Sequence, residues 1–135
     1  MHLEAENNEE ALRSINSAIQ HSERHGTFEG KEVLYLFASH IYDLIGDYKS
    51  AEFHINKSLQ LNQSYARAYI GKANILFNQR NINEALLYYQ QASQVNEQPD
   101  VAYISENSTL GIANSYNYLY QVSEHYDKKD FYVMA

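Results

Sequence analysis

The sequence predicts an all-α fold in which helical hairpins stack side by side. Apolar residues recur at steps of three and four along most of the chain, which is the period of an amphipathic helix, and no segment alternates with a period of two. One proline and five glycines in 135 residues leave such helices largely uninterrupted. Residues 46–62, GDYKSAEFHINKSLQLN, are followed 34 residues later by a similar stretch, RNINEALLYYQQASQVN, residues 80–96. A repeated hairpin indicates a stack, because one hairpin alone cannot bury both of its apolar faces.

In the first complete hairpin, one helix is expected from Lys31 to Ile45, and a second helix begins after Gly46. Gly46 ends the first helix because glycine accepts the left-handed conformation that closes a helix. Asp47 is then placed to cap the second helix with its side chain. The expected buried stripes are Leu34, Tyr35, Ala38, Ile41, Tyr42 and Ile45 in the first helix, and Tyr48, Ala51, Ile55, Ser58 and Leu59 in the second.

The second hairpin follows the same plan. Asn81 and Glu84, three residues apart, form a pattern similar to a capping box at the start of its second helix. The expected buried stripes are Tyr69, Ala73, Leu76 and Phe77 in the first helix, and Ile82, Ala85, Tyr89, Ala92 and Val95 in the second.

Equivalent positions of the two copies share residue types: an aromatic early in the first helix, a small residue four positions later, a small residue in the second helix, then an aliphatic or aromatic residue and another small one. These pairs are Tyr35 and Tyr69, Ser39 and Ala73, Ala51 and Ala85, Ile55 and Tyr89, and Ser58 and Ala92. With the turn Gly46-Asp47-Tyr48, they make the stretch from Glu32 to Pro99 resemble two tandem tetratricopeptide repeats, a family of 34-residue helical hairpins. The resemblance implies a right-handed solenoid of about three helical hairpins. Four residues depart from the family pattern: Lys72 replaces a leucine, Arg80 replaces the turn glycine, and Gln63 and Glu97 replace the terminal proline.

Both flanks are expected to be largely helical as well. Residues 8–22 carry apolar side chains at helical spacing and are predicted to be the second helix of an earlier repeat, followed by a connection around residues 25–30. Beyond Pro99 we expect a lengthened helix or an ordered loop near residues 100–109, and a tyrosine-rich helix over residues 110–122. A turn at His125–Asp127 would then lead into a last helix. Residues 1–135 are expected to form one domain, as a fragment of a longer solenoid or chain.

The charge balance argues against nucleic acid as a partner. The chain has 17 acidic and 10 basic residues and a formal charge of −7, whereas phosphate backbones are bound by clustered positive charge. No apolar run is long enough to span a membrane, and the acidic start, MHLEAENNEE, does not resemble a signal peptide. The absence of cysteine fits a reducing compartment. We therefore expect a soluble, cytoplasmic protein with no membrane partner.

Residues that could carry chemistry are few, and each has a simpler structural explanation. His21 and His25 are four residues apart on one helical face, as a metal-binding pair requires, but the spacing supplies no third ligand. Ser39, His40 and Asp43 contain the residue types of a nucleophile triad, but on one helix their side chains diverge around the axis. The 13 tyrosines fall mostly on buried stripes, which favours core packing over stacking with bases. We expect no catalysis, no metal and no cofactor.

The resemblance implies a binding surface, because in that family the first helix of each repeat lines a concave groove. The residues at groove positions are Val33, Leu36, Phe37, His40, Asp43 and Leu44 in the first complete repeat, Arg67, Ile70, Gly71, Asn74, Phe77 and Asn78 in the second, and Asn114, Ser115, Tyr118 and Gln121 in a looser third register. Aromatic and aliphatic side chains in such a groove can anchor a peptide or a helix, while Asn and Arg orient it. The alternative is that neighbouring repeats, or the connection after Pro99, cover some of these residues.

The sequence therefore indicates a non-catalytic scaffold or adaptor that binds another protein. Members of the resembled family that bind chaperone tails clamp a terminal carboxylate with Lys and Asn. Leu36, His40 and Gly71 stand at such positions here, so a chaperone C-terminal tail is not expected as the partner. The alternative function is self-assembly as a structural segment of a larger protein. A candidate contact surface for a homodimer is the apolar end of the chain, Phe131, Tyr132, Val133 and Met134.

Overall fold

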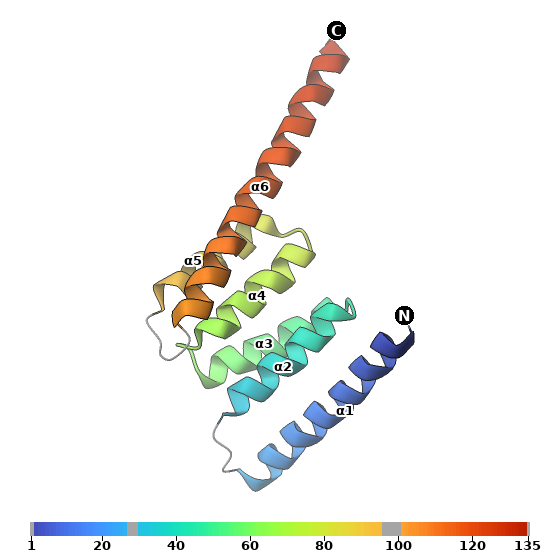
Figure 1. Ribbon diagram of the computed structural model, residues 1–135, viewed down its shortest axis with the longest axis vertical. Coiled ribbons are helices and arrows are strands. Elements are labelled where there is room, and N and C mark those ends of the chain that lie inside the picture. The colour runs from blue at the N-terminus through green and yellow to red at the C-terminus, as the bar shows by residue number, and fades with distance from the viewer. Residues whose placement is uncertain (1, 27–29, 96–100, 135) are drawn as a thin grey trace.

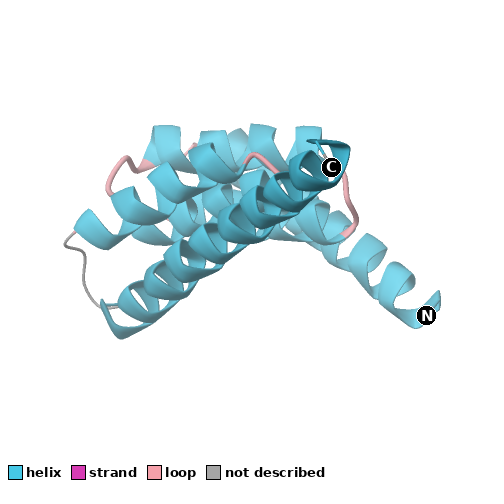
Figure 2. Cartoon of the chain, turned by 90° about the horizontal axis from the view of Figure 1, so that it is seen from above, coloured by secondary structure: helices cyan, strands magenta, loops and turns pink. Residues whose placement is uncertain are grey.

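The computed structural model describes residues 2–26, 30–95 and 101–134, and it describes the side chains of residues 7–26, 30–95 and 102–124. The described residues form helices joined by short turns, with no strand among them (Figure 1, Figure 2). The helices are α1 (His2–His25), α2 (Lys31–Leu44), α3 (Tyr48–Leu61), α4 (Ala66–Asn78), α5 (Ile82–Gln94) and α6 (Val101–Met134). The prediction of an all-α solenoid is confirmed.

The helices are stacked in chain order (Figure 1). α2 packs against α3, and α4 packs against α5, which gives the two predicted hairpins. α2 also touches α4, and α4 touches α6, whereas α3 and α5, which are both fully described, do not touch each other. The first helices of successive hairpins therefore lie closer together than the second helices. This difference places α2, α4 and α6 along one inner side of the stack.

Small residues occupy the places where the helices cross. Ala38, Ala51, Ala73 and Ala85 are completely buried. Because an alanine side chain is a single methyl group, the backbones of paired helices can approach closely at these positions. Larger side chains such as Ile55 then fill the space on either side of each crossing.

Two serines at the remaining small positions are buried without leaving a hydroxyl unsatisfied. The hydroxyl of Ser39 donates to the backbone oxygen of Leu36 at 2.7 Å. The hydroxyl of Ser58 donates to the backbone oxygen of Glu32, also at 2.7 Å, and so connects α3 to the start of α2. Both serines therefore act as small core residues whose polar atoms carry no desolvation penalty.

The turns of the two hairpins are built identically, although one contains glycine and the other arginine. Gly46 and Arg80 have φ values of 82° and 66°, which place both residues in the left-handed region. In each turn the left-handed residue and its successor donate backbone hydrogen bonds to the end of the preceding helix. Arg80 therefore takes the glycine position at a conformational cost, since left-handed backbone is unfavourable for a residue with a Cβ.

The predicted helix caps have different outcomes. Asp47 is the N-cap of α3, and its side chain accepts a hydrogen bond from the backbone N–H of Ser50 at 3.2 Å, as predicted. The prediction of a capping box at Asn81 is wrong, because the Asn81 side chain makes no capping hydrogen bond. A capping box also needs the backbone N–H of the N-cap residue for its glutamate. In Asn81 that N–H already donates to the backbone oxygen of Leu76 at 2.9 Å.

α1 occupies the place of a second-type helix before the first complete hairpin, as predicted. It packs against α2 alone among the described helices, through Ile15 and Ile19. The hydroxyl of Tyr35 on α2 donates a hydrogen bond to the carboxylate of Glu23 on α1. Burial, then the hydrogen bond to Glu23 and the negative charge of Glu23, together raise the pKa of Tyr35 to about 12.

The prediction for the C-terminal flank is wrong in one respect. The expected turn at His125–Asp127 does not exist, because α6 is one helix from Val101 to Met134 (Figure 1). The segment has neither a glycine at the equivalent of Gly46 nor a proline, so nothing in its sequence stops the helix. The lengthened helix expected near residues 100–109 is the start of this same helix. The described chain thus contains two complete hairpins, preceded by α1 and followed by α6.

The left-handed backbone at Arg80 gives a test of the turn. Arg80→Gly should be more stable than Arg80→Ala by about 1 kcal/mol, because both variants lose the guanidinium and only alanine retains a Cβ. Urea unfolding of the two variants measures the difference. At the neighbouring Gln79, where φ is −84°, the order should be reversed. Equal stability of the two Arg80 variants would contradict the left-handed turn.

The crossing of α5 and α6 gives a second test. Gly111 is buried there, and a Cβ at this position would lie 2.6 Å from Cζ of Tyr89 and closer still to two other ring atoms. Gly111→Ala should therefore lower the unfolding free energy by about 1–3 kcal/mol, although alanine is the better helix former. In a Tyr89→Leu background the ring is absent, and the same change should be neutral or stabilising. A double-mutant cycle with no coupling between the two positions would contradict this packing.

Candidate protein-binding groove

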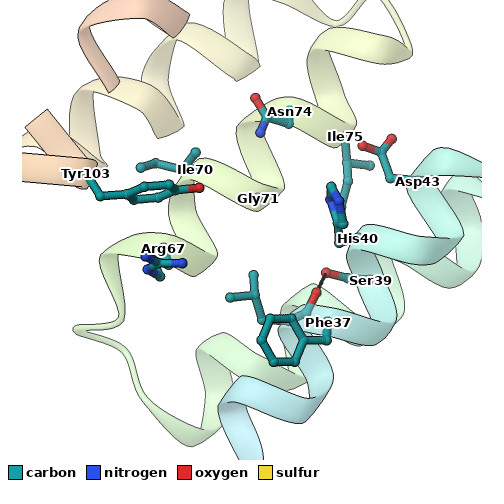
Figure 3. A pocket seen from close by; sticks show the side chains of 11 residues that line it. Phe37, Ser39, His40, Asp43, Arg67, Ile70, Gly71, Asn74, Ile75 and Tyr103 are labelled. Atoms are coloured by element: carbon teal, nitrogen blue, oxygen red, sulfur yellow. Dashed lines mark hydrogen bonds between the residues drawn. The ribbon is translucent and has the colours of Figure 1, made fainter. Parts of the chain in front are cut away.

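A pocket of about 240 Å³ lies on the inner side of the stack, between α2, α4 and the start of α6 (Figure 3). We call it the α2–α4 groove. Its lining residues are Leu36, Phe37, Ser39, His40 and Asp43 from α2, Arg67, Ile70, Gly71, Asn74 and Ile75 from α4, and Tyr103 from α6. Each of these residues of α2 and of α4 stands three or four positions from another one on the same helix, so they share one helical face. Two such faces meet because α2 and α4 pack against each other.

The floor of the groove depends on a residue without a side chain. A Cβ on Gly71 would lie 3.1 Å from Cδ1 of Ile55 and 3.2 Å from Cδ1 of Leu36, which is tighter than ordinary van der Waals contact. Glycine therefore leaves room for these two side chains beneath α4 and keeps the middle of the groove open (Figure 3).

The apolar lining of the groove includes a buried and an exposed side chain on opposite walls. Ile70 is almost fully buried, whereas Phe37 is 50% exposed and stands on the opposite wall (Figure 3). A half-exposed phenylalanine has apolar surface left to cover, while the helix that carries it is held by its buried face. This arrangement can take up an apolar side chain without a rearrangement of the backbone.

One end of the groove is polar and carries a cation. The guanidinium carbon of Arg67 lies 3.9 Å from the centre of the Tyr103 ring, within the range of a cation–π interaction. Tyr103 is not among the residues predicted from the sequence. It belongs to α6, beyond the end of the repeated pattern, and no helical spacing within α2 or α4 could place it.

The other end of the groove carries a carboxylate and two amides. The side-chain nitrogen of Asn78 donates to both oxygens of Asp43, each at 3.0 Å, and so connects α4 to α2. Asn74 accepts a hydrogen bond from the hydroxyl of Tyr89, which reaches the groove from α5. Burial, and to a smaller extent the negative charge of Asp43, together raise the pKa of Tyr89 to about 12.

Eight of the sequence-predicted groove residues line this pocket, and the others lie elsewhere. Phe77 packs edge-on against Tyr118, with ring centres 6.1 Å apart, and the guanidinium of Arg80 lies within 6 Å of both ring centres. Val33 and Leu44 are not part of the pocket lining, and Asn78 borders it only through its bond to Asp43.

The prediction that a third set of residues extends the groove is wrong for Ser115. Ser115 was expected on the groove surface, but it is completely buried, and its hydroxyl donates to the backbone oxygen of Gly111 at 2.8 Å. Ser115 lies one helical turn after Gly111, on the face of α6 that packs against Tyr89 of α5. Asn114 and Gln121 are exposed.

The residues weighed for chemistry have ordinary structural surroundings. The rings of His21 and His25 lie 4.4 Å apart at the exposed end of α1, and the described residues contain no group of three potential metal ligands. The hydroxyl of Ser39 already donates to Leu36 within its own helix. The side chains of Phe131, Tyr132, Val133 and Met134 lie outside the described residues, so their predicted role in a homodimer stays a prediction.

Among the described residues, no helix is both long enough and apolar enough to cross a bilayer.

Comparison with known protein families gives two adjacent matches. Residues 32–65 and residues 66–99 each match the model of the tetratricopeptide repeat. The two matches correspond to the two complete hairpins, α2 with α3 and α4 with α5. Comparison with curated proteins and with solved structures gave no significant match.

The raised pKa of Tyr89 predicts a loss of stability at alkaline pH. An unfolded tyrosine ionises near pH 10, whereas Tyr89 in the folded protein ionises near pH 12. Between these values the folded state holds the proton longer, so the unfolding free energy should fall as the pH rises. Tyr35 acts in the same direction.

Urea unfolding at about pH 9 and about pH 11 measures this fall. Tyr89→Phe should reduce it, while Leu87→Ala, at an exposed position of α5, should leave it unchanged. An equal effect of the two variants would contradict the special environment of Tyr89.

Proposed function

Because the chain belongs to the tetratricopeptide repeat family, whose hairpins generally mediate protein–protein interactions, we propose that it is a non-catalytic module that binds a segment of another protein in the α2–α4 groove. The observation that supports this most directly is the convergence of residues from three helices on one pocket. Leu36, Phe37 and Ile70 supply its apolar surface, and charged side chains stand at its two ends.

The size of the groove favours a protein segment over a small molecule. Pockets for small ligands usually measure about 300–1,000 Å³ and enclose most of the ligand. This groove, at about 240 Å³, has room for one or two apolar side chains of a longer segment. A peptide or an amphipathic helix could place an anchor between Phe37 and Ile70, while the rest of it extends along the inner side of the stack.

The polar ends would set the direction of the bound segment. Arg67 favours an acidic or carbonyl group at its end, and Asp43 favours a basic group or a donor at the other. A segment with that polarity would fit in one direction only. The acidic charge of the whole chain disfavours nucleic acid and strongly acidic tails, including the chaperone tails discussed above.

Peptides selected from a random display library on the wild-type protein provide probes for this proposal. Their affinities for variants can be measured by calorimetry. Phe37→Ala should weaken binding about fivefold or more, which corresponds to about 1 kcal/mol for a true anchor.

Phe53 supplies a matched control. It is 58% exposed, much like Phe37, but it lies on α3, outside the α2–α4 groove. Phe53→Ala should leave the affinity unchanged. If the selected peptides lose affinity with Phe53→Ala and not with Phe37→Ala, the binding site lies on the outer face and the proposal is wrong.

A further inference from the structure

α6 carries an uncharged outer face, which we define by Thr109, Leu110, Ala113, Tyr116, Asn117 and Tyr120. All six residues are exposed. Leu110, Tyr116 and Tyr120 are 57%, 55% and 67% exposed, although side chains of this size usually find partners. From Asn107 to Ser123 the chain has no charged residue, the longest such stretch in the sequence.

The equivalent face of α4 is covered by another helix. α4 has two buried sides. Ala68 and Ile75 belong to the cluster shared with α3, whereas Ala73 belongs to the cluster shared with α5, against which Phe77 also packs. One side therefore receives the preceding hairpin, and the other receives the second helix of the same hairpin.

On α6, only the side that faces the preceding hairpin has a partner among the described helices. Ile104 and Gly111 stand 36 residues after Ala68 and Ile75, and they face α5. By the same interval of 36 residues, Thr109 and Ala113 are the equivalents of Ala73 and Phe77, and both are exposed. Among the described helices α6 touches α4 and α5 only, so its outer face is an open helix-packing surface.

We propose that this outer face packs against the outer face of α6 in a second copy of the chain. The charge distribution favours a second copy as the occupant. The chain carries a net charge of −7, so most surfaces of two copies repel each other. The stretch from Asn107 to Ser123 allows two copies to meet with no like charges in contact, and its tyrosine and asparagine side chains can donate and accept hydrogen bonds with their own kind.

The order of large and small residues along this face favours an antiparallel arrangement. The small Ala113 lies at its middle, with Leu110 before it and Tyr116 after it. When two copies pack antiparallel with Ala113 at the twofold axis, Tyr116 of one copy lies over Leu110 of the other, and Asn117 lies over Thr109. Apolar side chains then meet on either side of a small residue, and the interface is isologous, with the same residues on both sides.

The available area is enough for a weak dimer. Buried aromatic side chains cover about 150–250 Å² each, so Tyr116 and Tyr120 at their present exposure leave roughly 100 Å² apiece. With Leu110 and the small residues between them, two copies reach roughly 1,000 Å², near the lower limit of a specific interface. Part of the protein should therefore dissociate on dilution.

Light scattering over a dilution series tests the association. The mass should fall from about twice 15.7 kDa towards 15.7 kDa on dilution. Tyr116→Glu should weaken association at least tenfold, because it would bury two carboxylates at one interface. Leu87→Glu on α5, at a position that is 64% exposed, should leave it unchanged. A mass of 15.7 kDa at every concentration, or equal effects of the two variants, would overturn the proposal.

The orientation can be tested separately because the chain contains no cysteine. Ala113→Cys should form a disulfide-linked dimer under mild oxidation, and Leu87→Cys should not. In a mixture, Leu110→Cys and Tyr116→Cys copies should link to each other more than to themselves. Preferential self-linking of Tyr116→Cys would indicate a parallel arrangement and overturn the antiparallel one. Since the α2–α4 groove is not involved, peptide binding should persist in all these variants.

Discussion

Close crossing of helices at alanine is the constraint on which the rest of this structure depends. Ala51 and Ala85 are completely buried at equivalent points of the two hairpins, 34 residues apart. A larger side chain at either point would force the paired helices apart. Because both hairpins carry a buried alanine at the equivalent point, the second hairpin repeats the first, and α4 comes to lie beside α2. The groove is a consequence of that placement.

Tyr89 connects the core of the second hairpin to the groove. Its ring packs against Gly111 of α6, and its hydroxyl donates to Asn74 at the groove surface. A single side chain thus sets the distance between α5 and α6 and also orients a polar group that lines the α2–α4 groove. The raised pKa of Tyr89 is a consequence of the same position, because the ring is buried and Asp43 is near enough to disfavour a second negative charge.

Residues that depart from the repeat pattern make local contacts that stabilise them in the fold. Lys72, which replaces a leucine, donates to the side-chain oxygen of Asn56 at 2.7 Å, and its ammonium lies 4.9 Å from the centre of the Tyr88 ring. Arg80, which replaces the turn glycine, accepts a left-handed backbone while its guanidinium packs over Phe77 and Tyr118. Contacts of this kind explain how the fold tolerates weak matches to the pattern.

Local sequence by itself determined the helices, the two hairpins and eight residues of the groove, because each depends on spacing within one helix or between adjacent helices. Helical periodicity places Phe37 and His40 on one face of α2 whatever surrounds that helix. Only the tertiary structure decided what lies beyond the repeats. Tyr103 joins the groove because the start of α6 packs beside α4, and Ser115 is buried because it lies one helical turn after Gly111, on the face of α6 that meets α5. Contacts between segments far apart in the chain have no period, so no local pattern encodes them.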